Sequence, residues 1–245
     1  MSDATLTPEG GSLKCDATQI GPLFSRLAEV RARIARAAES SRRDPAGVRL
    51  IAVSKLQPLE SIQAALAAGQ LRFGENYAQE LREKSEALGT GPEWHFLGAL
   101  QTNKVKLVVG RAALIHTCDR LPLAQELHKR AAALGLVQRV LIEVNLGDEA
   151  QKGGVAPGGL LELLRQLKQL PSLRAEGLMC IPPAHQEPRP HFRALARLRE
   201  QARAAGYEHI EELSMGMSAD YELAIAEGAT LVRVGTAIFG ERVAR

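Results

Sequence analysis

The chain has 245 residues, of which 45% are hydrophobic and 24% charged, an ordinary composition for a soluble globular protein. Its 31 Lys and Arg against 28 Asp and Glu give a net charge of +3, without the clustered basic residues of a nucleic-acid-binding surface. No apolar run approaches the roughly 20 residues that span a bilayer, and Met1–Ile20 lacks the pattern of a secretory signal. The three cysteines, Cys15, Cys118 and Cys180, show no CxxC spacing. We therefore expect a cytoplasmic protein without disulfides, a metal site, or a nucleic-acid or membrane partner.

The first 19 residues combine Ser, Thr, Gly, Pro and Asp with few apolar side chains. We therefore predict a flexible extension over residues 1–19 and one folded domain over residues 20–245. Apolar residues at helical spacing predict a leading helix, and they are Leu23, Leu27, Val30, Ile34 and Ala38.

Strand and helix patterns alternate along the rest of the chain. The predicted strands are Val48–Ser54, Gln70–Gly74, Trp94–Leu97, Leu114–Thr117, Val140–Asn145, Leu173–Ile181, Ile210–Leu213 and Thr230–Val234. The helices predicted between them are Leu59–Ala68, Ala78–Leu88, Gln101–Val109, Leu121–Leu134, Gly159–Leu170, Pro190–Ala205 and Ala219–Glu227.

This alternation predicts an α/β protein that forms a single (β/α)₈ TIM barrel with an extra N-terminal helix. The strands are continuous apolar runs, which are typical of strands buried on both faces. An open doubly wound sheet is the alternative, but it usually needs a glycine-rich first turn, and Ser54–Pro58 contains no glycine.

Lys55 is the first candidate site residue, because working residues of such barrels lie at the carboxyl ends of strands. It follows the apolar run Leu50–Ser54, so its amine would lie in a partly desolvated barrel mouth. Desolvation disfavours the ammonium form and favours a nucleophilic amine that can form Schiff bases with carbonyl compounds. The alternative is an ordinary solvated lysine.

Two loops predict a phosphate-binding cradle opposite Lys55. In Ser214–Ser218, Gly216 would allow close approach of an anion and Ser218 would be a helix N-cap. Gly235 and Thr236 follow the last strand in the same way, and phosphate sites of barrels often use these two loops. Each loop alone could be a plain turn before a helix.

Arg233 interrupts the last apolar strand and needs a partner if it is buried. It could face the helices and pair with a carboxylate there, or face the barrel interior and meet a ligand. Glu75, after the second strand, could act as an acid or base or pair with a nearby cation. The six histidines show no HExxH or HxH spacing that would indicate a metal site.

Taken together, six ordered motifs resemble those of the pyridoxal phosphate homeostasis proteins, the YggS/PROSC family. The motifs are Leu50–Lys55, Phe73–Tyr77, Trp94–Gly98 with Leu100–Lys104, Gly177–Met179, Leu213–Ser218 and Val232–Gly240. The resemblance implies a barrel like the N-terminal domain of alanine racemase, with pyridoxal 5′-phosphate held as an aldimine on Lys55. It further implies cofactor-binding roles for Asn76, Ser214, Met215, Met217, Ser218, Arg233, Gly235 and Thr236.

The family's function would be to hold the cofactor and deliver it to apo-enzymes that depend on pyridoxal phosphate, with the chain acting as a monomer. An arginine at the ring nitrogen would keep that nitrogen unprotonated and leave the cofactor a weak electron sink. We therefore expect no strong catalytic activity. An amino-acid racemase is the alternative, but alanine racemase takes a second catalytic base from a further domain, and the sequence ends at Arg245. A class I aldolase would explain Lys55 but neither the cradle nor Arg233.

Overall fold

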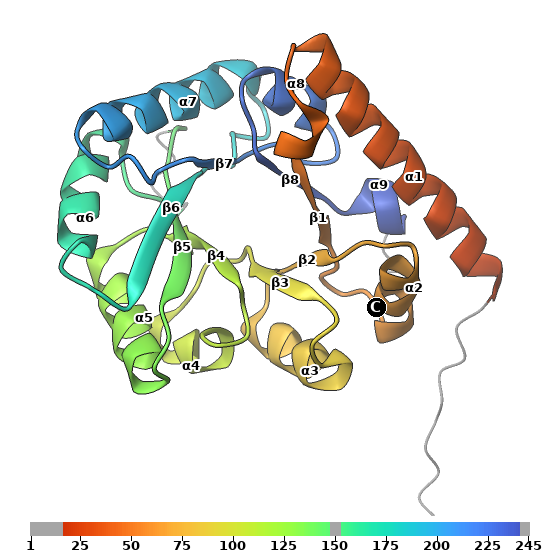
Figure 1. The fold of residues 1–245 in the computed structure, drawn as a ribbon, viewed down its shortest axis with the longest axis horizontal. Helices are drawn as coiled ribbons and strands as arrows, with labels where there is room; N and C mark the ends of the chain where they lie inside the picture. The colour runs from red at the N-terminus through yellow and green to blue at the C-terminus, as the bar shows by residue number, and fades with distance from the viewer. Residues whose placement is uncertain (1–16, 148–152, 241–245) are drawn as a thin grey trace, which may run out of the picture.

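Eight parallel strands close into a barrel in the order of the sequence, because β8 pairs with β1 and leaves no free edge (Figure 1). The computed structural model describes residues 17–147 and 153–240. Its strands are β1 (Arg49–Val53), β2 (Arg72–Glu75), β3 (Glu93–Phe96), β4 (Leu114–Cys118), β5 (Gln138–Glu143), β6 (Leu173–Met179), β7 (Glu212–Ser214) and β8 (Leu231–Val234). The predicted TIM barrel is confirmed.

Helices surround the barrel on its outside (Figure 1). They are α1 (Ala17–Ser40), α2 (Leu59–Ala67), α3 (Ala78–Leu88), α4 (Val105–Val108), α5 (Leu121–Ala133), α6 (Leu160–Leu167), α7 (Arg189–Ala204), α8 (Tyr221–Ala226) and α9 (Thr236–Phe239). Within the described residues, no helix is long and apolar enough to cross a membrane.

Helix α1 is the extra N-terminal helix that the sequence predicts. It begins at Ala17, inside the extension expected over residues 1–19, and the rest of that extension lies outside the described residues. Its buried side chains include all five that helical spacing selects, Leu23, Leu27, Val30, Ile34 and Ala38. The helix packs against α2, α8 and α9, so it covers the barrel where its first and last strands meet.

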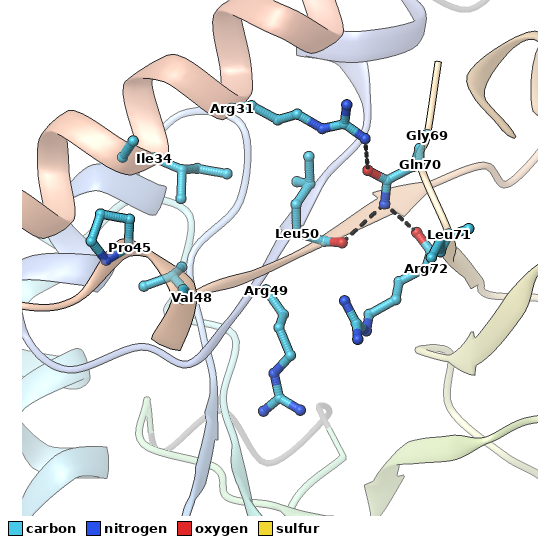
Figure 2. Close-up of a pocket in the computed structure, with 12 residues that line it drawn as sticks. Arg31, Ile34, Pro45, Val48, Arg49, Leu50, Gly69, Gln70, Leu71 and Arg72 are labelled. Carbon is cyan, nitrogen blue, oxygen red and sulfur yellow. Dashed lines mark hydrogen bonds between the residues drawn. The ribbon is translucent and has the colours of Figure 1, made fainter. Parts of the chain in front are cut away.

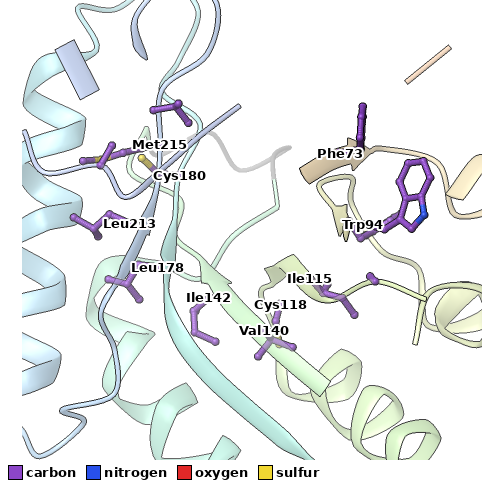
Figure 3. Close-up of a cluster of buried hydrophobic side chains, with 14 of the residues drawn as sticks. Phe73, Trp94, Ile115, Cys118, Val140, Ile142, Leu178, Cys180, Leu213 and Met215 are labelled. Atoms are coloured by element: carbon purple, nitrogen blue, oxygen red, sulfur yellow. The ribbon is translucent and has the colours of Figure 1, made fainter. Parts of the chain in front are cut away.

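The apolar side chains of the barrel form two layers, because successive residues of a strand face opposite sides. The inner layer fills the barrel with Ile51, Leu97, Leu114, Leu141, Met179 and Leu231. The larger outer layer lies between the strands and the helices, and Figure 3 shows part of it, including Val140, Ile142, Leu178 and Leu213. This alternation decides which polar side chains reach the interior.

Most elements differ from the sequence prediction only by small shifts of their bounds, and the short helix α9 was not expected. Two further elements differ more. The helix expected over Gln101–Val109 divides into a 3₁₀ turn, Thr102–Lys104, and the four residues of α4. The strand expected over Ile210–Leu213 starts later, because the Ile210 N–H donates to the Tyr207 carbonyl in a turn. The strand also ends one residue later than expected, so β7 includes Ser214.

Candidate functional site

Lys55 lies in the turn after β1, two residues beyond Val53 at the carboxyl end of the barrel, and is half-buried. Ile51 and Val53, the inward-facing residues of β1, belong to the inner layer and lead towards the turn that holds Lys55. The loop after β8 lies next to this strand, since a Cβ on Gly235 would come within 3.3 Å of the Val53 carbonyl oxygen. Lys55 therefore stands beside this loop of the predicted cradle, and not opposite it as the sequence analysis expected.

Helix α3 holds the backbone on both sides of Lys55. The Lys84 Nζ donates to the Ser54 carbonyl at 2.6 Å, and the Leu56 N–H donates to Glu80 Oε1, also at 2.6 Å. Leu56 has a φ of 62°, which is an unusual conformation for a residue with a side chain. The turn that presents Lys55 is therefore fixed by tertiary contacts.

Glu75 pairs with a cation, which is the second of its two interpretations. Its side chain is fully buried, and Oε1 accepts from the Lys84 Nζ at 2.8 Å and from the Ser54 hydroxyl at 2.7 Å. Burial raises the pKa of Glu75, and the Lys84 charge opposes that rise. The sequence analysis missed Lys84, although its place on the helical stripe with Leu81 is a signal that it is buried.

Arg233 faces the barrel interior. Leu231, two residues before it, belongs to the inner layer, and Arg233 is 5% exposed. Its guanidinium donates to the Ser214 hydroxyl at 2.6 Å and to the Cys180 carbonyl at 3.0 Å. Burial lowers the pKa of Arg233. These partners are neutral, so the group keeps its charge available for a ligand at the mouth.

Two histidines extend this polar cluster into the barrel. The Ser214 hydroxyl lies 2.8 Å from His116 Nδ1, and His116 Nε2 lies 2.9 Å from His95 Nδ1. Both rings are buried, and burial lowers the pKa of each. The sequence analysis considered histidines only for metal spacing. The signal it missed is a polar residue two positions from an inner-layer leucine, as His116 is from Leu114.

The loop after β7 packs tightly on α8. Gly216 has a φ of 91°, and a Cβ there would come within 2.6 Å of Ala224 Cβ and 2.8 Å of Tyr221 Cα. Glycine is therefore required at this position by the contact with α8. The sequence analysis had explained it by the approach of an anion.

Ser218 joins the two loops of the predicted cradle. Its hydroxyl accepts from the Gly235 N–H at 3.3 Å. The prediction that Ser218 caps a helix is wrong, because α8 begins at Tyr221 with Asp220 at its N-cap position. The Asp220 side chain instead accepts from the Met217 N–H at 2.6 Å, which closes a turn.

The other four candidate residues differ in exposure. Thr236 is exposed at the start of α9, and Met217 is exposed in the loop after β7. Met215 is fully buried in the outer layer, which Figure 3 shows. Asn76 is half-buried after β2.

Glu143 is a further ionisable group at the mouth that the sequence analysis missed. It ends β5, two residues after Leu141 of the inner layer. Burial, assisted by the charge of Asp119, raises its pKa to about 7, while Arg233 opposes the rise. With a pKa of about 7, the Glu143 carboxyl group is only partly ionised near neutral pH.

A cavity of about 340 Å³ lies at the opposite end of the strands, where β1 and β2 begin (Figure 2). Gln70 crosses it, accepting from Arg31 at 3.2 Å and donating to the Leu50 and Arg72 carbonyls at 3.0 and 2.7 Å. These contacts connect α1 to the first two strands, so the cavity is part of the scaffold and separate from the mouth.

Comparison with known proteins identifies the family. The family described as "Alanine racemase, N-terminal domain" matches residues 25–243. A pyridoxal phosphate homeostasis protein of Aquifex aeolicus is 47% identical over 221 residues, which are 89% of this chain and 97% of that protein. The chain therefore belongs to the pyridoxal phosphate homeostasis protein family, whose barrel is that of the alanine racemase N-terminal domain.

Solved structures agree with this assignment. PipY of Synechococcus elongatus PCC7942, in a structure with PLP bound, superposes with a TM-score of 0.76 at 38% identity and covers 89% of this chain and all of that one. Alanine racemase from Corynebacterium glutamicum superposes with a TM-score of 0.67 at 16% identity, over 89% of this chain and 62% of that one. At 16% identity, the similarity to alanine racemase shows a shared fold only.

Proposed function

We propose that this protein binds pyridoxal 5′-phosphate at the barrel mouth and acts in its homeostasis, holding the cofactor and releasing it to apo-enzymes. The observation that carries the proposal is the placement of Lys55 and Arg233 on neighbouring strands of the barrel, with the lysine in the turn after β1 and the buried arginine in β8, which pairs with β1. The family membership and the PLP-bound PipY structure support it.

The residues at the mouth fit three polar groups of this cofactor, which are its aldehyde, its ring nitrogen and its phosphate. Bound there, pyridoxal phosphate would supply an aldehyde that condenses with a primary amine. Lys55 provides the amine, and the Arg233 guanidinium provides donors for the ring nitrogen. Arg233 stays protonated in a protein, so it donates to that nitrogen and does not give it a proton. Asn76, after β2, would lie beside the ring.

The phosphate would bind between the loops after β7 and β8. The first N–H groups of a helix have no partner within it, and in α9 they belong to Thr236 and Ala237. Gly235 leaves the approach open, and the Ser218 hydroxyl ties the two loops together at 3.3 Å. Of the remaining predicted contacts, Met217 would line the entrance, whereas Ser214 and Met215 are buried behind it.

A carrier role suits this site better than racemisation. Racemisation needs an acid or base on each face of the substrate Cα and a strong electron sink. Lys55 can serve one face, and Arg233 keeps the sink weak. We propose that the protein works in the cytoplasm as a monomer, with apo-enzymes as its partners.

The test is to load the purified protein with pyridoxal phosphate, reduce it with borohydride and map the modified peptide. The adduct is expected on Lys55. Lys55→Ala should remove it, and Lys104→Ala, which changes a lysine of the 3₁₀ turn before α4, should leave it in place. An adduct on another lysine, or no binding at all, would overturn the assignment.

A second measurement separates a carrier from a racemase. The loaded protein should reactivate an apo-enzyme that depends on pyridoxal phosphate, and it should not exchange the Cα proton of L- or D-alanine with deuterated water. Exchange at enzyme-like rates that is lost in Lys55→Ala would establish racemase chemistry.

A further inference from the structure

A line of hydrogen-bonded side chains crosses the barrel interior from the mouth to the opposite end. From the mouth inwards, Arg233 Nη1 donates to Ser214 Oγ at 2.6 Å, and Ser214 Oγ lies 2.8 Å from His116 Nδ1. His116 Nε2 lies 2.9 Å from His95 Nδ1, and His95 Nε2 lies 3.2 Å from Glu93 Oε1. The five residues come from β8, β7, β4 and β3. All but Glu93 are at most 5% exposed.

The ends of the line fix the direction of every bond in it. Arginine has only donors, and an ionised carboxylate has only acceptors. The His95 hydrogen bond, assisted by the charges of nearby arginines that include Arg72, lowers the pKa of Glu93 to about 2, so Glu93 is ionised. Burial lowers the pKa of His95 and of His116, which favours the neutral form of each ring, and a neutral ring carries one N–H.

Only one arrangement then satisfies all four contacts. His95 donates its Nε2–H to Glu93, and its Nδ1 accepts the Nε2–H of His116. The Nδ1 of His116 accepts the hydroxyl proton of Ser214, and the oxygen of Ser214 accepts from Arg233. Reversing any one bond would leave two donors or two acceptors facing each other in a buried site, where an unsatisfied polar group is costly.

This arrangement leaves Ser214 without a proton for an anion. Its single O–H is donated to His116, and its oxygen is the acceptor that holds one arm of the guanidinium. The Cys180 carbonyl holds the other arm at 3.0 Å. The sequence analysis gave Ser214 a role at the cofactor, and its contacts instead connect it to Arg233.

We propose that Ser214, His116 and His95 are positioning residues, which fix the Arg233 guanidinium in the orientation that meets the ring nitrogen of pyridoxal phosphate. The proposal rests on the proposed function for the identity of the ligand. The hydrogen-bond arrangement itself exists without any ligand, so the two can be tested separately.

The first experiment needs no cofactor. Long-range ¹⁵N–¹H NMR correlations of the histidine rings at pH 7 report which nitrogen carries the proton. His116 and His95 should both be neutral Nε2–H tautomers, and the spectrum should lose these signals one at a time in His116→Phe and His95→Phe. An Nδ1–H tautomer or a charged ring at either position would overturn the proposal.

The second experiment measures pyridoxal phosphate binding and the absorption maximum of the loaded protein. His116→Phe keeps a planar ring and removes both nitrogens. It should weaken binding by about 10-fold, the order expected when a hydrogen bond to a charged group loses its geometry, and it should shift the absorption maximum. The matched control is Leu114→Met, which changes an inner-layer side chain of the same strand without changing a polar group. It should leave both values as they are.

A double-mutant cycle shows whether His116 acts through Arg233. In an Arg233→Met background, His116→Phe should weaken binding by less than about twofold, because coupled residues are not additive. Two results would refute the positioning role and leave the binding function intact. One is full additivity of the two substitutions, and the other is a His116→Phe variant whose affinity and spectrum equal those of the wild type. Failure of the wild-type protein to bind pyridoxal phosphate would refute the proposed function, and the NMR result would still decide the arrangement.

Discussion

Replacing Lys84 with methionine should destabilise the barrel and loosen the turn that carries Lys55. Lys84 is 6% exposed, and its Nζ donates to Glu75, Glu80 and the Ser54 carbonyl at 2.6 to 2.8 Å. Methionine fills a similar volume but makes none of these bonds. The change therefore removes a charge from a buried pair and leaves the rest of the packing in place.

The magnitude follows from what each partner loses. Glu75 is fully buried, and removing one member of a buried ion pair costs about 3–5 kcal/mol, because the other charge is left unpaired. Glu80 is partly exposed and keeps the Leu56 N–H, so it adds little. The loss of a donor to the Ser54 carbonyl adds about 1 kcal/mol. We expect a loss of roughly 4 to 6 kcal/mol in the free energy of unfolding.

The assay is urea unfolding followed by the fluorescence of Trp94, which is the single tryptophan of the chain and lies buried beside Phe73. The matched control is Lys129→Met, an exposed position of α5, which should change the free energy by less than about 0.5 kcal/mol. The double variant Lys84→Met with Glu75→Gln should recover most of the loss, since it leaves no buried unpaired charge.

Two results would refute this reasoning. A loss in Lys84→Met that is no larger than in Lys129→Met would mean that the buried pair contributes nothing to stability. A double variant as unstable as Lys84→Met alone would mean that the unpaired charge of Glu75 is not the cause. Cofactor binding measured on the same variants should weaken in Lys84→Met, because the backbone on one side of Lys55 is no longer held.

Three further predictions use the same measurements. Burial raises the pKa of the Glu143 carboxyl group in the folded protein from its usual 4.5 to about 7, so the folded protein binds the carboxyl proton more tightly than the unfolded chain does. The stability that this group contributes is therefore full below pH 4.5 and declines as the pH rises towards 7. Relative to Glu143→Gln, the wild-type free energy of unfolding should therefore fall by about 3 kcal/mol across that window, and parallel pH profiles would contradict the assignment. Gly216→Ala should cost about 2 kcal/mol or more, because its φ is 91° and a Cβ would overlap α8, whereas Gly47→Ala, with nothing within 4 Å of the added Cβ, should be nearly neutral in urea unfolding. Thr236→Ala should weaken pyridoxal phosphate binding by about 10- to 100-fold, the size of one lost hydrogen bond to a charged phosphate. The absorption maximum should not shift, and a shifted maximum would place Thr236 at the ring.

The sequence by itself determined the barrel and the position of Lys55 at the carboxyl end of its first strand. Strands that are apolar on both faces and separated by amphipathic helices can bury their surfaces in only a few ways. A closed barrel of parallel strands buries both faces of all eight strands and leaves no free edge. Period-2 alternation and strand ends are local properties. For this reason Lys55 could be located at the mouth before any contact was known, and the buried stripe of α1 could be given residue by residue.

The tertiary structure decided how the polar side chains are paired, because their partners are distant in the sequence. Glu75 could have been an acid or the partner of a cation, and only the position of α3 made Lys84 that cation. Ser214, at the end of β7, faces the barrel interior within reach of Arg233 on β8 and of His116 on β4. Local spacing cannot predict such a line of hydrogen bonds, since it forms only when strands far apart in the chain enclose the same interior.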